Sequence, residues 1–419
     1  MSRPSRLDVF YGDELVGSLH DASPLSFEYA PAWLVRATPM TIANIGFGPG
    51  RNDSAAVQAY FENLLPEGEL RAYIAQQNQA STLFSMLLAV AGDTAGAFLI
   101  LPEGEQPVPP AYEATSWAAI AGLLGKNPAA AVDIHGTDAR ISLAGAQDKV
   151  SLAVFDDGVP RLPRGTAPST HILKPDIRRL GKVWHSAVNE TVLMRTAAHC
   201  GLPTAEVFYE PHTQACLVRR FDRARRPDGT LVRLVQYDLC QLAGTRSDRK
   251  YEKEGGPGIE ACAEMIRRYS TQPAVDLRNF VCWIFFNLYT GNNDSHAKNL
   301  SLYWRPGGAV TLTPFYDLMS SRVYPGLARD FALSVGGEFR PGALTRSHVE
   351  AMAGQLRMRP AFVLRQAAEM AEKIPEALDA ALQAMVPVVP PGGKDLATKL
   401  RAFVLSTTRR TAVRLAGPP

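Results

Sequence analysis

The five cysteines of this 419-residue sequence stand singly, and no C-x-x-C pair occurs among them. Their odd number and scattered positions argue against a disulfide framework and against a zinc site. The thiols are therefore expected to be reduced and mostly buried, as in a cytoplasmic protein. Charge of one sign is also lacking, because a formal net charge of +3 is too small to argue by itself for a polyanionic partner.

Long apolar runs and hydrolase motifs are lacking too. The basic N-terminus, residues 1–6, is followed by no apolar signal-peptide core, so secretion and membrane insertion are not expected and we predict a cytoplasmic protein with no membrane partner. The eight histidines form no H-E-x-x-H pair of the kind that zinc hydrolases use. A serine or cysteine hydrolase is poorly supported as well, because no G-x-S-x-G elbow is present.

The order of predicted elements divides the chain. Residues 7–18 alternate apolar and polar side chains around a Gly-Asp break, which predicts a β-hairpin, and residues 54–77 have a helical period. A stretch rich in proline and glutamate at 102–114 has the composition of a linker. We therefore predict a mixed α+β fold in three segments: a small N-terminal α+β domain at 1–105, a linker with a short helix at 106–137, and a catalytic domain at 138–419 that is helical from His348 onward.

The chain is organised around the stretch Gly291–Asn299, which follows directly on an apolar run at 278–289. That run is apolar on nearly every side, as in a buried helix, and it is well short of the ~20 residues that span a bilayer. A buried helix that ends in polar and glycine residues holds a loop rigidly, and such loops frequently carry a protein's chemistry. Asp294 and Asn299 are the candidate functional residues of this loop.

Asp294, Asn299 and Asp317 follow the order of a protein-kinase catalytic centre, in which an Asp-x-x-x-x-Asn loop precedes two strands and a further aspartate. Phosphoryl transfer needs a carboxylate that orients or deprotonates the attacking hydroxyl. It also needs oxygen ligands that hold Mg²⁺ against the phosphates. Asp294 can supply the first, and Asn299 and Asp317 the second. ATP and Mg²⁺ are therefore the expected cofactors.

Further parts of such a centre occur upstream. Lys174 ends a short apolar strand, and the predicted helix at 188–200 carries Glu190 in its first turn, which is the order of a kinase N-lobe. The small-residue string at 144–149 is flexible enough to wrap a phosphate, although it has neither the Walker nor the G-x-G-x-x-G pattern. Taken by itself, the string is explained equally well as a hairpin turn that binds no ligand. Lys174 taken by itself is explained equally well as a solvated lysine at the end of a strand. Their combination in one order favours a kinase.

Two other features leave alternatives open. His296 competes for acid–base or metal chemistry, and with Asp294 and Asp317 it could describe a metallohydrolase. The arginine-rich run at 219–226 could bind phosphate or nucleic acid, but its alternation with Phe221 and an aspartate favours internal pairing for some of the arginines. The polar stretch at 244–258 is a natural place for substrate contacts or regulation.

A set of short strings, taken together, resembles the HipA family of serine/threonine-kinase toxins, and the resemblance covers most of the chain. In the N-terminal part the matching strings are Phe61–Pro66 and Gly92–Gly96, and the rest are Ile141–Lys149, Thr170–Lys174, Arg220–Arg223, Asp238–Gln241, Gly255–Gly258, Asn293–Asn299 and Leu312–Asp317. The resemblance implies a protein-kinase-like bilobal domain with an all-helical C-terminal lobe after the N-terminal α+β domain.

The resemblance also implies an activity and partners. Members of the family are kinase toxins of toxin–antitoxin pairs, in which a small helix-turn-helix antitoxin of the HipB kind neutralises the toxin and binds operator DNA. The implied protein substrate is an aminoacyl-tRNA synthetase, typically glutamyl-tRNA synthetase, whose phosphorylation starves translation and favours persistence.

Residue roles carry over position by position. Asp294 is then the catalytic base, Asn299 and Asp317 are the Mg²⁺ ligands, and Ser142 is the site of an inactivating autophosphorylation. A phosphate group at Ser142 would repel ATP from the adjacent phosphate loop. The implied ATP-binding residues are Ala144, Gly145, Ala146, Gln147, Asp148, Lys149, Lys174, Arg219, Arg220, Phe221, His296, Lys298, Asn299, Tyr316 and Asp317.

One departure from the family pattern concerns the hinge that meets adenine, where Arg219 replaces a glutamate of the best-known relatives. If backbone groups make the contact, the change is tolerated; if the side chain makes it, adenine affinity is affected. Two other hypotheses remain at this point. One is a corepressor of a DNA-binding antitoxin with little kinase activity, which the intact set of Asp294, Asn299, Asp317 and Lys174 disfavours. The other is a small-molecule kinase.

Overall fold

The computed structural model describes residues 4–37, 40–90, 93–126, 147–178 and 180–417. The chain folds into two compact units, each assembled from separate stretches of sequence. The first unit consists of Met1–Leu173, Arg220–Asp248 and Tyr303–Arg305, and the second of Lys174–Arg219, Arg249–Leu302 and Pro306–Pro419. Within the described ranges, no helix combines the length and apolar character needed to cross a bilayer.

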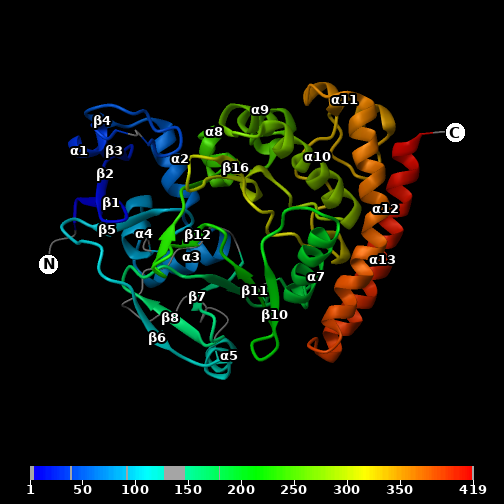
Figure 1. The fold of residues 1–419 in the computed structure, drawn as a ribbon, viewed down its shortest axis with the longest axis horizontal. Coiled ribbons are helices and arrows are strands. Elements are labelled where there is room, and N and C mark those ends of the chain that lie inside the picture. The colour runs from blue at the N-terminus through cyan, green and yellow to red at the C-terminus, as the bar shows by residue number, and fades with distance from the viewer. Residues whose placement is uncertain (1–3, 38–39, 91–92, 127–146, 179, 418–419) are drawn as a thin grey trace. The chain divides into compact units, whose positions relative to one another are not determined.

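The first unit opens with an antiparallel sheet of strand order β4-β3-β2-β1-β5, drawn mainly in blue in Figure 1. The predicted hairpin is confirmed, because β1 pairs with β2 from Arg6 opposite His20 to Tyr11 opposite Glu14. Every residue of β5 is buried, as expected for a strand covered on both faces. The elements of this part are β1 (Arg6–Tyr11), β2 (Glu14–His20), β3 (Ser26–Tyr29), α1 (Pro31–Leu34), β4 (Arg51–Asn52), α2 (Ala55–Asn63), α3 (Gly68–Gln77), α4 (Leu83–Val90) and β5 (Phe98–Pro102).

The rest of the first unit contains a second antiparallel arrangement, in which β6 pairs with β8, β8 with β7, and β7 with β9. A short hairpin, β12–β13, follows later in the sequence. The elements here are β6 (Ala111–Ala114), α5 (Trp117–Lys126), β7 (Val150–Val154), β8 (Pro160–Arg164), β9 (His171–Lys174), β12 (Arg223–Arg225), β13 (Leu231–Arg233), β14 (Gln236–Asp238), α8 (Leu239–Ala243) and the 3-10 turn η1 (Ser247–Arg249).

The second unit is mostly helical. Its two longest helices, α12 and α13, run side by side (orange and red in Figure 1), and both pack against α7 and α10. The predicted helical C-terminal region is confirmed. The elements are α7 (Ser186–His199), β10 (Val207–Glu210), β11 (Ala215–Arg219), η2 (Glu252–Glu254), α9 (Ile259–Tyr269), α10 (Pro273–Thr290), η3 (Ala297–Asn299), β15 (Ser301–Trp304), β16 (Val310–Leu312), η4 (Ser321–Val323), α11 (Arg346–Gln355), α12 (Pro360–Met385) and α13 (Pro391–Ala416).

One helix boundary differs from its prediction. Helix α7 begins at Ser186 rather than Val188, so Glu190 lies in the second turn and not in the first. The helix starts earlier because Ser186 and Ala187 bond to the carboxylate of Asp176, with the backbone N–H of Ala187 2.9 Å from Oδ1. A carboxylate at this position satisfies donors that the first turn of a helix leaves open.

Helix α10 forms the core of the second unit and explains why its sequence is apolar on nearly every side. All residues from Phe280 to Thr290 are buried, and the Trp283 ring stacks against Phe280 and Phe315 at centroid distances of 6.0 and 6.1 Å. Pro273 starts the helix, where a missing backbone N–H is harmless. The predicted buried helix is thus confirmed, and it delivers the loop that follows to a fixed place.

The cysteine prediction also holds. All five thiols are free and buried. Burial raises the pKa of Cys200 to about 12 and that of Cys282 above its ordinary value. These thiols are therefore protonated packing groups at neutral pH.

Candidate active site

The loop after α10 is held by its own backbone and by hydrogen bonds to a neighbouring segment. Gly291 ends the helix in the left-handed conformation, with φ of +74°, which glycine adopts without a Cβ penalty. The side-chain amide of Asn293 donates to the carbonyl oxygens of Ala328 and Arg329, at 3.1 and 2.7 Å. Because Gly291 and Asn293 are fixed in this way, the backbone that leads to Asp294 is held in place.

The carboxylate of Asp294 is accessible and oriented. Its side chain is 54% exposed, and the hydroxyl of Tyr251 donates to Oδ1 at 2.5 Å. The side-chain amide of Asn299 donates to the backbone carbonyl of Asp294 at 3.0 Å, and Nε2 of His296 lies 3.9 Å from Oδ1. The structure therefore brings together the loop residues predicted from the sequence.

Lys174 forms the second part of the site, at the end of β9. Its Nζ lies 2.5 Å from Oε1 of Glu190 on α7 and 2.9 Å from Oδ1 of Asp317. The lysine and the glutamate are buried, whereas the Asp317 side chain is 43% exposed. A lysine held by one buried and one accessible carboxylate is fixed in position while its surroundings stay open on the aspartate side.

The electrostatics keep this lysine charged. Burial by itself would lower the pKa of Lys174, because an ammonium group loses its hydration. The carboxylates of Asp317 and Glu190 outweigh that effect and raise the pKa above its ordinary value. The group therefore remains a cation at physiological pH, which is the state that phosphate binding requires.

Asp317 has an unusual backbone. Its φ is +58°, in the left-handed region that few residues other than glycine, asparagine and aspartate adopt. Two residues earlier, the backbone N–H of Phe315 donates to Pro203 at 2.7 Å, and Phe315 forms a parallel bridge with Thr204. The left-handed turn directly after this anchor is what directs the Asp317 carboxylate to Lys174.

Three other predicted nucleotide-pocket residues lie in the second unit. His296 and Lys298 are buried, and the His296 ring meets the Tyr251 ring edge-on at 5.2 Å. The hydroxyl of Tyr316 donates to the carbonyl oxygen of Lys298 at 3.1 Å. Their contact with a nucleotide stays a prediction, and the structure gives each of them a packing role around the loop.

The predicted phosphate loop is described only in part. Ser142, Ala144, Gly145 and Ala146 lie outside the described residues. Gln147, Asp148 and Lys149 belong to the first unit and lead into β7, whereas Lys174, Asp294 and Asp317 belong to the second. The role of the loop stays a prediction.

The predicted hinge residues are engaged within the protein. Arg219 is exposed and lies 3.0 Å from Glu206, so its side chain makes a surface ion pair. Arg220 is buried, and its backbone N–H donates to Thr170 at 2.8 Å. The ring of Phe221 meets Tyr303 at 6.2 Å. The guanidinium of Arg220 is thus paired within the protein, and contact of these residues with adenine stays a prediction.

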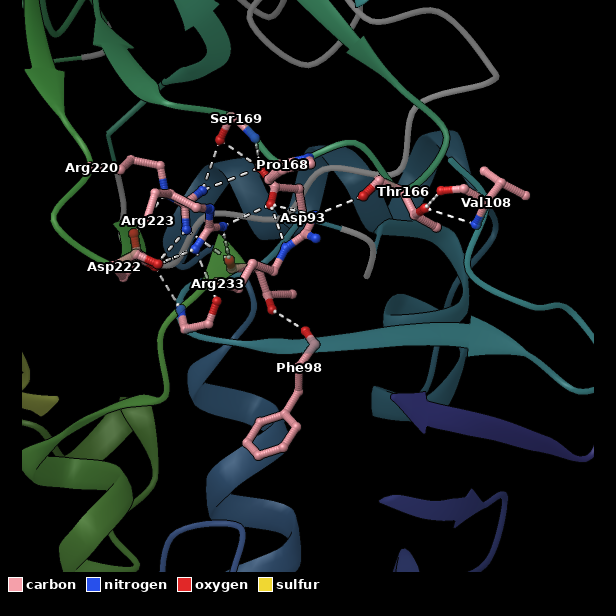
Figure 2. Close-up of polar contacts among 12 residues, drawn as sticks. Asp93, Phe98, Val108, Thr166, Pro168, Ser169, Arg220, Asp222, Arg223 and Arg233 are labelled. Carbon is pink, nitrogen blue, oxygen red and sulfur yellow. Dashed lines mark hydrogen bonds and ion pairs between the residues drawn. The ribbon is translucent and has the colours of Figure 1, made fainter. Parts of the chain in front are cut away.

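What occupies Arg220 is a buried ionic network in the first unit, shown in Figure 2. It joins five charged side chains: Asp93, Arg220, Asp222, Arg223 and Arg233. Arg220 donates hydrogen bonds from Nε and Nη2 to the carboxylate of Asp222, at 2.9 and 2.8 Å. Oδ1 of Asp93 accepts from Arg223 at 2.8 Å and from Arg233 at 3.1 Å. Part of the arginine-rich run thus pairs internally, the alternative that its alternation with Asp222 favoured.

The network shifts the ionisation of its members. Burial would raise the pKa of Asp222, but Arg220 and Arg223 outweigh it and hold the pKa at about 2. Asp93 is held well below its ordinary pKa in the same way by Arg223, Arg220 and Arg233, against the effect of burial. Burial and the neighbouring guanidinium of Arg220 lower the pKa of Arg223 to about 10. With three arginines and two aspartates, the network carries one excess positive charge.

The predicted metal ligands, Asn299 and Asp317, offer side-chain oxygen atoms, which are the ligands that suit Mg²⁺. In the described part of the chain, no group of three or more His, Cys, Asp or Glu side chains is placed so that it could hold a metal. Asn299 donates through its amide nitrogen, and its Oδ1 remains the atom suited to a hard cation. Mg²⁺ is commonly held by one or two protein oxygens together with substrate phosphates.

Two residues were not predicted from the sequence: Tyr251, which bonds to Asp294, and Asp93, which joins the buried network. Tyr251 lies in the polar stretch at 244–258, where substrate contacts were expected, but nothing in the pattern of that stretch distinguishes it. Asp93 belongs to the string Gly92–Gly96 that carries the family resemblance, yet its role in the network depends on arginines far along the chain.

Comparison with protein-family models gives two matches that together span most of the chain. Residues 7–101 match the HipA N-terminal domain, and residues 141–381 match the HipA-like C-terminal domain. The protein Y4mE of Sinorhizobium fredii is 34% identical over 345 residues, which are 79% of this chain and 80% of that protein. The chain belongs to the HipA family.

Two further comparisons concern named members of that family. The serine/threonine-protein kinase toxin HipA of Shewanella oneidensis is 27% identical over 404 residues, covering 89% of this chain and 88% of that protein. A solved complex of HipA and HipB with operator DNA from the same species contains a chain that is 24% identical, with a TM-score of 0.83 over 99% of this chain and 100% of that chain. The predicted fold class, a mixed α+β protein with an N-terminal sheet domain and a kinase-like fold, is confirmed.

Proposed function

We propose that this chain is an ATP- and Mg²⁺-dependent serine/threonine protein kinase that acts as the toxin of a toxin–antitoxin pair. The observation that carries the proposal is the bridge from Lys174 to Glu190 and Asp317, in a unit that also holds Asp294 and Asn299 in one rigid loop. A packing explanation accounts for the buried pair of Lys174 and Glu190, but not for two accessible carboxylates at Asp294 and Asp317.

Each residue has a chemical task in this proposal. Lys174 balances the charge of the ATP phosphates, and Asn299 and Asp317 would hold Mg²⁺, which neutralises charge on the β- and γ-phosphates when bound. Asp294 accepts the proton of a serine hydroxyl as its oxygen forms a bond to the γ-phosphorus. The bond between that phosphorus and the bridging β–γ oxygen breaks, and ADP leaves. The accessible side chain of Asp294 is compatible with a protein hydroxyl as the acceptor.

The partners follow from family membership. We propose a helix-turn-helix antitoxin of the HipB kind, with operator DNA bound mainly through that antitoxin, because the solved relative is a complex of those components. The proposed substrate is an aminoacyl-tRNA synthetase, and the proposed compartment is the cytoplasm, which free, buried thiols suit. Ser142 is the proposed site of inactivating autophosphorylation.

A phosphorylation assay tests the proposal. The purified chain is incubated with γ-labelled ATP and Mg²⁺, alone and with a panel of aminoacyl-tRNA synthetases, beside the Asp294→Gln variant. We expect label on one synthetase and on Ser142, located by peptide mapping, and none with Asp294→Gln. Absence of label on every protein in the wild-type reactions would refute the kinase assignment. Circular dichroism of the variant checks that its fold is retained.

A further inference from the structure

The helix that ends the chain carries a positively charged hollow. Six side chains of α13 line an open hollow of 660 Å³: Leu405, Ser406, Arg409, Arg410, Val413 and Arg414. They occupy positions four residues apart in two rows, so they share one face of the helix. Val413 is 66% exposed, although it is apolar. The hollow therefore combines guanidinium groups with exposed apolar surface.

Two more arginines extend this charge toward the catalytic loop. Burial lowers the pKa of Arg322, and the like charges of Arg329, Arg410 and Arg414 lower it further. Burial and Arg410 act on Arg414 in the same direction. The arginines are thus close enough to repel one another. A cluster of like charges is destabilising by itself, so an anion bound here would relieve the repulsion.

Two arginines of the cluster, Arg322 and Arg414, are partly buried and contact neighbouring residues. The Nε atoms of Arg322 and Arg414 are buried and have no hydrogen-bond acceptor among the described residues. The guanidinium of Arg322 lies over the Phe403 ring at 5.7 Å, and Nη2 of Arg414 donates to the carbonyl oxygen of Pro341 at 2.9 Å. These contacts hold the two arginine side chains in place.

The cluster is tied to the catalytic loop through the backbone. The N–H of Arg322 donates to Gly291 at 3.1 Å, and the carbonyl oxygen of Arg329 accepts from Asn293 at 2.7 Å. A Cβ added at Gly291 would lie 2.6 Å from the Phe403 ring of α13 and 3.2 Å from Cβ of Arg322. The loop that carries Asp294 thus rests against the elements that carry the arginines.

We propose that the arginine hollow, formed by Arg409, Arg410 and Arg414 with Leu405 and Val413, is a docking surface for an acidic, partly apolar segment of the protein that this kinase phosphorylates. The proposal rests on the proposed function. A carboxylate-rich peptide satisfies guanidinium groups in a bidentate manner, and its apolar side chains cover Leu405 and Val413. A phosphate backbone would satisfy the charges but leave Val413 exposed, so the observations favour a peptide over nucleic acid.

Fluorescence anisotropy tests the surface without requiring catalysis. The probes are a labelled 12-residue peptide of repeating Glu-Glu-Leu, an all-Glu peptide of the same length, and a labelled 12-nucleotide oligo-dT. Of the three probes, we expect the Glu-Glu-Leu peptide to bind the wild type most tightly. Its affinity for Arg410→Glu should be at least tenfold lower than for the wild type, and its affinity for Val413→Asn should also be lower. The matched control Arg365→Glu, an exposed arginine on α12 that pairs with Glu369, is expected to bind as the wild type does.

Two comparisons between the wild type and Arg410→Glu would overturn the proposal. One is equal affinity of the Glu-Glu-Leu peptide for the wild type and Arg410→Glu. The other is tighter binding of oligo-dT that is lost in Arg410→Glu, which would assign the surface to nucleic acid. Autophosphorylation separates this proposal from the kinase assignment, because Arg410→Glu is expected to label itself as the wild type does. A wild type that binds the peptide but never transfers phosphate refutes only the kinase assignment, and one that transfers phosphate but ignores the peptide refutes only the docking surface.

Discussion

Nζ of Lys174 lies 2.5 Å from Oε1 of Glu190, and both side chains are almost fully buried. Burying one such charge without the other is unfavourable by several kcal/mol, so the pair exists as a unit. The second carboxylate on the lysine, Asp317, is accessible and comes from a different part of the second unit. Glu190 therefore has the task of fixing the lysine, and Asp317 is left to act on a ligand.

The substitution Glu190→Gln should release Lys174 from its fixed position while the lysine itself stays in the protein. Glutamine has nearly the same shape, and Lys174 keeps Asp317, so the fold is expected to survive. The lysine loses its fixed position, and a misplacement of ~1 Å in a catalytic group lowers rates by about 100-fold. We expect kcat/KM for phosphoryl transfer to fall by that order. Steady-state kinetics against ATP measure the effect.

Glu210→Gln provides a matched control for this experiment. Glu210 is also buried in the second unit, but its carboxylate bonds to Thr213 and His212 and not to Lys174. Normal activity is expected for this variant. If both glutamine variants lose activity equally, the loss reflects general destabilisation and the assigned role of Glu190 is wrong.

Tyr251→Phe tests the residue that the sequence did not reveal. Its hydroxyl donates to one oxygen of Asp294, which leaves the other for a substrate hydroxyl. Hydrogen bonds to charged groups contribute about 1.5–3 kcal/mol, and exposure reduces this value, so we expect a loss of roughly 3- to 10-fold in kcat/KM. The KM for ATP should not change. Tyr269→Phe, whose ring is covered by Arg268, serves as control, and an unaltered rate for Tyr251→Phe would remove Tyr251 from the site.

Asp93→Asn should destabilise the first unit. The variant leaves Arg220, Arg223 and the partly buried Arg233 with one carboxylate, and breaking a buried ionic network typically lowers the free energy of unfolding by about 3–5 kcal/mol. Urea denaturation of both proteins measures the difference. Asp53→Asn, an exposed position in the same unit, should stay within about 0.5 kcal/mol of the wild type. An Asp93→Asn protein as stable as this control would contradict the role of the network.

The same network predicts a loss of stability in acid. The pKa of Asp222 is about 2 in the folded protein and that of Asp93 is well below its ordinary value, whereas unfolded aspartate titrates near about 3.9. A depressed carboxyl pKa stabilises the fold above the unfolded pKa, and this stabilisation is lost as the pH falls through the folded pKa. The free energy of unfolding should therefore decline from about pH 5 to about pH 2. Asp93→Asn should show a shallower decline, and parallel curves for the two proteins would disprove the linkage.

The sequence predicted the regular elements well, because their signals are local. Helix α10 is apolar on nearly every side, and the hairpin of β1 and β2 alternates around a Gly-Asp turn, so neither prediction needs knowledge of distant residues. The spacing of Asp294 and Asn299 is equally local, and the structure places the two in contact.

Long-range pairings could not be predicted in the same way. Whether Arg220 and Arg223 bind an external phosphate or pair internally depends on Asp93, which lies more than a hundred positions earlier and has no periodic relation to them. The bond between Tyr251 and Asp294 is similar, because a polar stretch without a period gives no sign of which side chain turns inward. The start of α7 was misplaced because the capping carboxylate, Asp176, lies before the helix and outside its pattern.

The buried network has a consequence for how the protein can be divided. Asp93 falls within the region that matches the HipA N-terminal domain, while its three arginines fall within the region that matches the HipA-like C-terminal domain. A truncated gene that encodes only the C-terminal match would produce a chain with two uncompensated positive charges in its interior. We therefore expect the region that matches the HipA-like C-terminal domain to be less stable when it is produced without the N-terminal region.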